Sequence, residues 1–374
     1  MNIINRIDLV EIFIVKLPLV EAFETSLEVE THKEALLLKL SSEDDWGWGE
    51  CVTSPNPFYS CETNETALYI IRAYLLPNLM KKRNFSLEEV VKGFERIRGH
   101  NMAKATVENA LHDLIAKKNS TPLYKLIGGN KKKIMSGISF GIKKDSNELL
   151  SSIENALKKK YHRIKIKIKK GMDIKPVQTV RNAFPDIKLM VDANCDYSLT
   201  DIKILKQLDE HNLMMIEQPL DHNDLYFHSK LQKELKTPIC LDESIKNLND
   251  TKVAIKLRSC QIINIKQGRV GGIMKAKAIQ NYCIDNNIKT WSGGMLETGI
   301  GRAFNVHLQT LPGFTLPGDT SETSRYFKED IVEPSVVLRS DGFIDIPKGN
   351  GIGVQVIPER LERFTITSEK IEAK

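Results

Sequence analysis

The sequence predicts an α/β protein: a TIM-type barrel joined to a smaller α+β domain. From about residue 135 onward, short runs rich in β-branched residues alternate with helical patterns, which indicates βαβ units and a parallel sheet. The ends of these runs recur regularly: Lys167, Asp192, Glu217 and Asp242 follow one another at intervals of 25 residues. Eight strands at this pitch favour a closed barrel, with catalytic residues at the C-terminal ends of the strands. An open doubly wound sheet is the alternative, but it normally has fewer strands.

The predicted elements fall into three segments. Residues 1–130 form the α+β domain, residues 131–334 form the barrel, and residues 335–374 are expected to return and pack on the N-terminal domain. In the first segment we expect strands at 7–19 and 33–50 and helices at 65–80 and 101–118. The barrel strands are predicted at 136–142, 163–168, 188–194, 213–219, 237–244, 260–266, 288–295 and 314–319, and helices at 147–160, 174–184, 199–211 and 273–286. The last segment has strand-like patterns at 336–346 and 349–356.

Composition narrows the class of protein. Of the 374 residues, 41% are hydrophobic and 27% are charged, as in ordinary globular proteins. No apolar run reaches the roughly 18 residues that a membrane-spanning helix needs. The net charge of +6 is a weak bias over this length, so we expect neither nucleic acid nor membrane as a partner. The six cysteines form no CxxC pair, which favours free thiols in a cytoplasmic protein.

Three carboxylates are the candidate metal ligands. Asp192, Glu217 and Asp242 end three consecutive predicted strands, and neighbouring strands lie about 5 Å apart, so the side chains should converge. Unpaired anions at that spacing would repel each other strongly. A hard divalent cation resolves this, because Mg²⁺ prefers oxygen ligands. We therefore expect one Mg²⁺ or Mn²⁺ per subunit. The alternative is three separately salt-bridged carboxylates.

The cations of the stretch YHRIKIKIKKG, residues 161–171, fall on one face of their predicted strand. A solvated lysine face is the simplest explanation. Inside a barrel, however, the same parity places Lys165 and Lys167 in the catalytic interior, with the isoleucines packed outward against helices. Lys266 ends the strand that follows the carboxylates, so it should face Lys167 across the metal. A second cation and a metal beside Lys167 disfavour its ammonium form, which suits it to act as a general base.

A divalent metal between two lysines suits one type of reaction. A substrate carboxylate binds the metal, a lysine removes the adjacent α-proton, and the metal stabilises the negative charge that develops. We therefore expect an enzyme that acts on a small-molecule carboxylate. A non-enzymatic binding or structural barrel is the alternative, and it predicts no metal-dependent exchange of the α-proton in D₂O.

These residues resemble those of the enolase superfamily, muconate-lactonizing subgroup. The resemblance covers nearly the whole chain and rests on KIK (165–167), VDAN (191–194), IEQP (216–219), LDES (241–244) and NIKQGRVGG (264–272). Narrower motifs are most similar to those of o-succinylbenzoate synthases and N-succinylamino acid racemases. They are PLVEAFETS (18–26), GWGECVTSPNPFYS (47–60), SGGMLETGIGRA (292–303) and LPGDTSETSRYF (316–327).

The resemblance implies a (β/α)7β barrel under a capping domain, Mg²⁺ on the three carboxylates, and Lys167 and Lys266 as paired acid–base groups with Lys165 in support. It also implies a pocket that loops of the capping domain close. Arg269 matches an arginine of relatives that racemise, and Gln267 stands where the family more often has proline. By position, the residues lining the pocket would be Phe23, Tyr59, Asn194, Arg269, Gly294 and Met295.

Some of these assignments have simpler explanations. Packing at a domain interface would account equally well for Phe23 and Tyr59, and Asn194 could orient its loop without touching substrate. Glu243, next to the third metal ligand, should point away from the metal by strand alternation.

Two reactions fit the same residues. A synthase would remove water from 2-succinyl-6-hydroxy-2,4-cyclohexadiene-1-carboxylate to give o-succinylbenzoate, an intermediate of menaquinone biosynthesis, with Lys167 as the only base and Lys266 as a stabilising cation. A racemase of N-succinylamino acids would need one lysine on each face of the substrate. Dipeptide epimerisation and muconate cycloisomerisation are more distant alternatives. We expect the protein to be a homo-oligomer, a dimer or higher.

Overall fold

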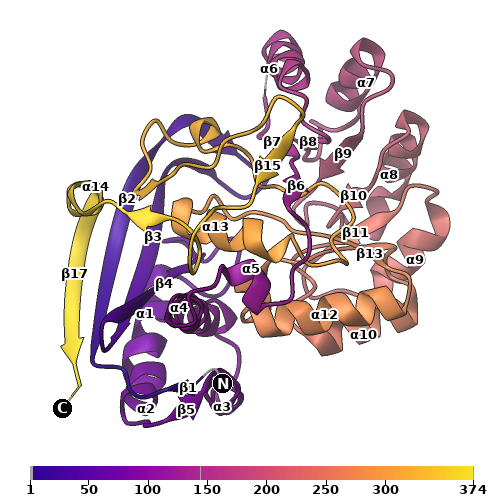
Figure 1. Ribbon diagram of the computed structural model, residues 1–374. Helices are drawn as coiled ribbons and strands as arrows, with labels where there is room; N and C mark the ends of the chain where they lie inside the picture. Colours follow the sequence, from indigo (N-terminus) through magenta and orange to yellow (C-terminus); the bar gives the residue numbers. More distant parts are fainter. Residues whose placement is uncertain (1–2, 144, 374) are drawn as a thin grey trace.

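The computed structural model describes residues 3–143 and 145–373. Its largest sheet has seven parallel strands, β7 to β13, and each pairs with its neighbours in the sequence. Helices connect the strands and surround the sheet (Figure 1), which confirms the predicted α/β barrel class. The strands are β7 (Ile138–Phe140), β8 (Ile164–Lys167), β9 (Leu189–Asp192), β10 (Ile216–Glu217), β11 (Ile239–Leu241), β12 (Ile262–Asn264) and β13 (Lys289–Trp291). The helices are α6 (Ser146–Lys158), α7 (Ile174–Ala183), α8 (Ile202–Leu208), α9 (Tyr226–Glu234), α10 (Leu248–Leu257), α11 (Gln267–Val270), α12 (Ile273–Asp285) and α13 (Gly299–Leu308).

The prediction of a regular eighth strand at residues 314–319 is wrong. This segment makes only isolated bridges, from Phe314 to β13 and from Gly318 to the residue two places before β7. Pro317 has no backbone N–H to donate, so a continuous ladder cannot form here. The segment still fills the space between the last and first strands, because the Gly137 N–H donates to the Gly318 carbonyl at 2.8 Å. The barrel is therefore closed by a strand-like connection.

Side chains of the barrel strands alternate between the outer helices and the barrel axis. The isoleucines of β8 belong to the large core shared with the helices. On the inner face, a separate apolar cluster has one residue from each of five consecutive strands. In most of these strands, the residue two positions after the apolar one is polar and points to the same inner face. The cluster consists of Met190, Met215, Cys240, Ile262 and Trp291. It forms the floor of the barrel interior, on which the polar layer rests.

The N-terminal unit, here called the capping domain, is an antiparallel sheet with helices packed on one side (Figure 1). Its strands lie in the order β17-β2-β3-β4. Helix α4 can pack closely on β4 because Gly47 and Gly49 have no side chain. A Cβ on Gly47 or Gly49 would lie 2.0 or 2.1 Å from a backbone oxygen of α4. Its elements are β2 (Leu9–Glu24), β3 (Val29–Ser42), β4 (Asp45–Cys51), α1 (Asn64–Ile70), α2 (Leu76–Met80), α3 (Leu87–Phe94), α4 (Asn101–Lys118) and β17 (Thr365–Glu372).

The C-terminal segment divides between the two units. β15 (Phe343–Asp345) is all that forms a strand within the predicted run 336–346, and it pairs with β6 (Lys133–Met135), just ahead of the barrel. β14 (Val332–Glu333) pairs with β16 (Gln355–Val356), and the last strand, β17, pairs along β2 of the capping domain. In the part of the chain that the structure describes, no helix has the length and apolar character needed to cross a bilayer.

Glu50, at the end of β4, joins the capping domain to the barrel. Its carboxylate accepts hydrogen bonds from the Thr298 N–H (2.9 Å), the Thr298 hydroxyl (2.6 Å) and the Gly301 N–H (2.8 Å), at the start of α13. A carboxylate at this position satisfies N–H groups that the first turn of a helix leaves free. Glu50 therefore fixes the loop that leads from β13 into α13.

Helix α4 makes a second joint, with the loop after β12. Glu108 accepts a hydrogen bond from the Met274 N–H at 2.8 Å, in the first turn of α12. Next to it, the Asn109 amide donates to Oε1 of Gln267 at 2.9 Å, and both side chains are buried. Gln267 thus binds the capping domain directly beside Lys266.

Candidate active site

The polar layer above the barrel floor gathers five of the residues predicted from the sequence. Lys167, Asp192 and Glu217 end β8, β9 and β10, and the pairing of these strands places them side by side. Asp242 directly follows β11, and Lys266 lies two residues after β12. The three carboxylates are at most 1% exposed. One end of the barrel thus holds the three candidate ligands and both lysines.

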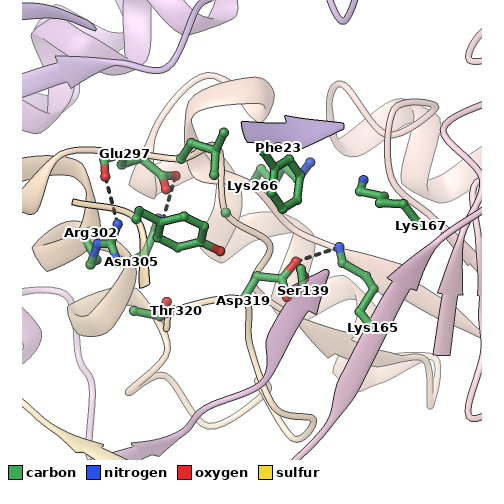
Figure 2. A pocket seen from close by; sticks show the side chains of 13 residues that line it. Phe23, Ser139, Lys165, Lys167, Lys266, Glu297, Arg302, Asn305, Asp319 and Thr320 are labelled. Carbon is green, nitrogen blue, oxygen red and sulfur yellow. Dashed lines mark hydrogen bonds and ion pairs between the residues drawn. The ribbon is translucent and has the colours of Figure 1, made fainter. Parts of the chain in front are cut away.

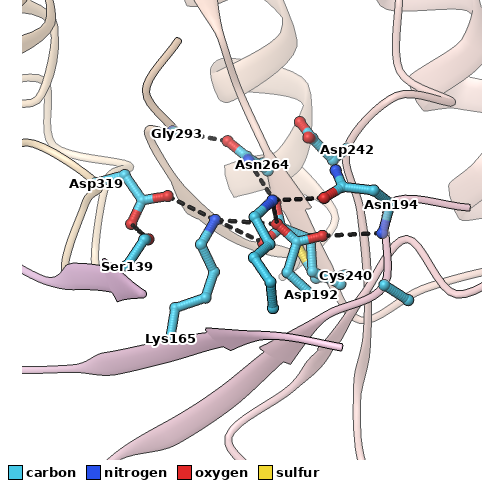
Figure 3. A network of polar contacts seen from close by, with 12 residues as sticks. Ser139, Lys165, Asp192, Asn194, Cys240, Asp242, Asn264, Gly293 and Asp319 are labelled. Carbon is cyan, nitrogen blue, oxygen red and sulfur yellow. Dashed lines mark hydrogen bonds and ion pairs between the residues drawn. The ribbon is translucent and has the colours of Figure 1, made fainter. Parts of the chain in front are cut away.

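Lys165 links two of the carboxylates, and Figure 3 shows it beside one of them, Asp192. Its Nζ lies 3.2 Å from Oδ2 of Asp192 and 3.0 Å from Oε2 of Glu217. The Nζ of Lys167 lies 2.6 Å from the same Oδ2 of Asp192 and 2.6 Å from Oδ1 of Asn194. Ammonium groups therefore offset the repulsion between the two carboxylates.

Asp242 lies against a second group of cations. Its Oδ2 accepts a hydrogen bond from Lys266 at 2.8 Å, and its Oδ1 is paired with the guanidinium of Arg269. The Tyr59 hydroxyl accepts hydrogen bonds from Lys266 (2.9 Å) and Arg269 (3.3 Å). Arg269 also donates to two backbone oxygens. Arg269 is thus engaged by protein groups, and Lys266 rests between Asp242 and Tyr59.

Burial and charge together set the protonation of this layer. Burial raises the pKa of Glu217 to about 8, and the charge of Asp192 adds to the effect. Burial acts in the same direction on Asp192, but Lys167 and Lys165 outweigh it and hold the pKa of Asp192 well below its usual range. Burial would lower the pKa of Lys266, yet the attraction of Asp242 raises it above its usual value. The protein's own cations therefore leave Glu217 short of positive charge.

The donor set fits a hard divalent cation. Within residues 3–143 and 145–373, no three His, Cys, Asp or Glu side chains already meet as a metal site, and lysines contact all three candidate ligands. The candidates are nevertheless all carboxylates, the ligands that Mg²⁺ and Mn²⁺ prefer. The raised pKa of Glu217 marks a buried acid that lacks a full counter-charge. Asp192, Glu217 and Asp242 are therefore the residues that would hold the ion.

Two family models match the chain. "Mandelate racemase / muconate lactonizing enzyme, N-terminal domain" covers residues 9–128, and "Enolase C-terminal domain-like" covers residues 148–360. The chain belongs to the enolase superfamily. Enzymes of this superfamily generally use a divalent metal ion.

Relatives within the superfamily match nearly the whole chain. An o-succinylbenzoate synthase from Geobacillus kaustophilus is 46% identical over 92% of each chain. An N-succinylamino acid racemase from Amycolatopsis sp. is 42% identical over 95% of this chain and 96% of its own. A solved structure of an enolase-superfamily member from Listeria innocua matches with a TM-score of 0.95 and 39% identity, over 99% of this chain and 100% of its own. Both named relatives are enzymes of the superfamily.

A cavity of about 60 Å³ lies beside the lysines of this enolase-superfamily site (Figure 2). Lys165, Lys167 and Lys266 line it together with Phe23 of β2 and Gly294 after β13, so two of the predicted pocket residues reach it. Six further polar residues of its wall were not predicted from the sequence. They are Ser139, Glu297, Arg302, Asn305, Asp319 and Thr320. Four of them belong to the motif segments 292–303 and 316–327, which were the signal that could have found them.

Tyr59 lies in the wall of a second cavity, of about 630 Å³, between the capping domain and the loops after β9 to β12. Arg269 and Glu243 line it as well. Glu243 accepts a hydrogen bond from the Asn194 amide at 2.8 Å, so Asn194 connects it to Lys167. Met295 packs against the apolar core of the capping domain.

Proposed function

We propose that this protein is an o-succinylbenzoate synthase. It would remove water from 2-succinyl-6-hydroxy-2,4-cyclohexadiene-1-carboxylate to give o-succinylbenzoate, as a step of menaquinone biosynthesis. The observation that carries the proposal is the placement of Lys167 and Lys266 on β8 and after β12, which flank the three strands that bear the carboxylates. The 46% identity to the o-succinylbenzoate synthase from Geobacillus kaustophilus supports it.

The reaction needs one base and one fixed cation. A divalent ion on the three carboxylates would supply positive charge to the carboxylate of the substrate and so favour loss of the adjacent proton. Lys167, in its neutral form, accepts that proton at Nζ, while Asn194 orients the same nitrogen. As the C–O bond to the hydroxyl breaks, Lys167 returns the proton to the leaving oxygen on the same face, and water departs. Lys266, whose Nζ lies 2.8 Å from Oδ2 of Asp242, would stay protonated and stabilise the negative charge from the other side.

Racemisation of N-succinylamino acids is the second candidate, and the same pair of lysines favours it. For one enantiomer, Lys167 would remove the α-proton from its face of the substrate and Lys266 would protonate the opposite face. For the other enantiomer, the two lysines would exchange these roles. The 42% identity to the racemase from Amycolatopsis sp. supports this activity.

We propose Mg²⁺ or Mn²⁺ as the ion, one per subunit, because both prefer carboxylate oxygens and keep positions open for substrate. We also propose that the enzyme is a cytoplasmic homo-oligomer with a small-molecule carboxylate substrate.

Two arginine variants test the roles of the lysines. Lys266→Arg keeps the charge but removes a usable base, so racemisation should fall by several orders of magnitude while dehydration retains more of its rate. Lys167→Arg should abolish both activities. Lys169→Arg is the matched control, because Lys169 is paired with Glu24 at 3.0 Å and has no role in the mechanism. The measurement is kcat/KM for both substrates.

Exchange of the α-proton in D₂O adds a stereochemical check. The Lys266→Arg enzyme should still exchange one enantiomer of an N-succinylamino acid, the one whose proton faces Lys167, without inverting it. Racemisation by Lys266→Arg at the wild-type rate, or efficient dehydration by Lys167→Arg, would show that the assigned roles are wrong.

A further inference from the structure

Asp319 is a fourth carboxylate beside the candidate metal ligands. It lies on the strand-like segment that closes the barrel, and its side chain is 9% exposed. Its Oδ2 is 2.6 Å from the Nζ of Lys165, and Figures 2 and 3 both show this contact. The mechanism proposed above gives Asp319 no part.

The carboxylate of Asp319 is held from the opposite side as well. Its Oδ1 accepts hydrogen bonds from Ser139 at 2.8 Å and from Arg163 at 2.5 Å. Arg163 is 1% exposed, and its guanidinium lies 5.1 Å from the centre of the Trp291 ring in the barrel floor. Two buried groups thus fix Asp319, so that Lys165 meets an anion which cannot easily move.

Lys165 is the side chain that Asp319 shares with the metal site. An ammonium group has three N–H donors, and those of Lys165 face Asp319 at 2.6 Å, Glu217 at 3.0 Å and Asp192 at 3.2 Å. The shortest contact is the one to Asp319. Asp192 and Glu217 therefore receive only part of this cation. Without Asp319, the whole charge of Lys165 would compete with a divalent ion for these two carboxylates.

We propose that Asp319 is a positioning residue for the metal site: it draws the ammonium group of Lys165 away from Asp192 and Glu217, so that both carboxylates keep their charge for a divalent cation. This inference rests on the metal dependence of the proposed function. The segment at the eighth-strand position would then help to set the affinity of the site for the divalent ion.

The test measures binding of Mn²⁺ to the chelator-treated enzyme, by electron paramagnetic resonance of the free ion and without substrate. Asp319→Asn is isosteric but neutral, and it should weaken Mn²⁺ binding by roughly tenfold or more, the size of a lost buried charge contact. Asp319→Glu keeps the charge and should stay within about threefold of the wild type. Equal losses in the two variants, or no loss in Asp319→Asn, would overturn the inference.

A double variant separates action through Lys165 from every other role. In a Lys165→Met background there is no ammonium group to share, so Asp319→Asn should no longer change Mn²⁺ affinity. A tenfold loss that persists in this background would mean that Asp319 binds the ion itself or supports the fold, and the inference would fail. Asp330→Asn is the matched control, because Asp330 is 2% exposed and its Oδ1 accepts hydrogen bonds from the backbone N–H groups of Gly299 and Ile331 instead of from a lysine.

The outcome for the wild type keeps the two proposals apart. If the wild-type protein binds no Mn²⁺, the metal-dependent function fails, and this inference fails with it. If the wild type binds Mn²⁺ and Asp319→Asn binds it equally well, only the role of Asp319 is refuted. Where Lys165→Met does not fold, the comparison of Asp319→Asn with Asp319→Glu decides by itself.

Discussion

Replacing Glu50 with glutamine should change how the stability of this protein depends on pH. Glu50 is 1% exposed, and burial raises its pKa from 4.5 to about 7. In the unfolded chain the same carboxyl group titrates near its ordinary value. Between about pH 4.5 and pH 7, Glu50 is therefore protonated to a greater extent in the folded protein than in the unfolded chain. The contribution of Glu50 to the free energy of unfolding must fall as the pH rises through this window.

The size of the effect follows from the two pKa values. They differ by about 2.5, and each pKa unit corresponds to about 1.4 kcal/mol. Ionisation of Glu50 above pH 7 should therefore lower the free energy of unfolding by about 3 kcal/mol. Glutamine does not ionise. The stability of Glu50→Gln relative to the wild type should therefore rise by up to about 3 kcal/mol across the window. At the acidic end the variant should be the less stable of the two, because its amide accepts fewer hydrogen bonds from Thr298 and Gly301.

The assay is urea unfolding of both proteins at several pH values within and above this window. Other buried acids, such as Glu108 with a pKa raised by burial to about 8, are present in both proteins and cancel in the difference. Two stability curves that stay parallel across the window would refute the reasoning. They would mean that the pKa of Glu50 in the folded protein is close to its value in the unfolded chain, so that burial does not raise it.

Excess EDTA should abolish turnover, and Glu217→Ala should do the same while circular dichroism shows a retained fold; full activity in EDTA would contradict the metal-dependent mechanism. Proteolysis within residues 18–26 and 51–60 should slow when product is bound, because a lid must exclude water from the site; unchanged cleavage rates would count against closure. Gln267→Leu leaves the buried amide of Asn109 without its acceptor and should cost about 1–3 kcal/mol in urea unfolding. Asn109→Leu added to it should recover part of that loss, and additive losses would contradict a direct contact.

The regular part of the barrel could be predicted because its spacing is local. The strand ends of Lys167, Asp192 and Glu217 recur at one interval, and neighbouring parallel strands turn that interval into a shared level in space. The eighth strand was overestimated for a local reason as well, since hydrophobic residues surround Pro317 but its missing N–H interrupts the ladder. Local patterns of this kind therefore predict the fold class and the positions of the strand ends.

Contacts between distant segments could not be predicted in the same way. Asp319 meets Lys165 only because the closing segment lies between β13 and β7, where its carboxylate reaches the side chain of Lys165 on β8, and no periodicity links the two positions. The partner of Gln267 lies 158 residues earlier, on α4, so its role emerges only once the capping domain is placed. Both residues stand in motifs that were visible in the sequence, but the contacts of Asp319 depend on how the barrel closes, and those of Gln267 depend on the docking of the two domains.

The pairing of β17 with β2 has a consequence for synthesis on the ribosome. β2 emerges long before its partner, so residues 9–15, the part of β2 that β17 later covers, present an unpaired edge while the barrel is being translated. Such an edge is a template for pairing with other chains. A nascent chain that pauses before residue 365 is therefore the form of this protein most prone to aggregate, and variants that slow late translation should lower its soluble yield more than its thermodynamic stability suggests.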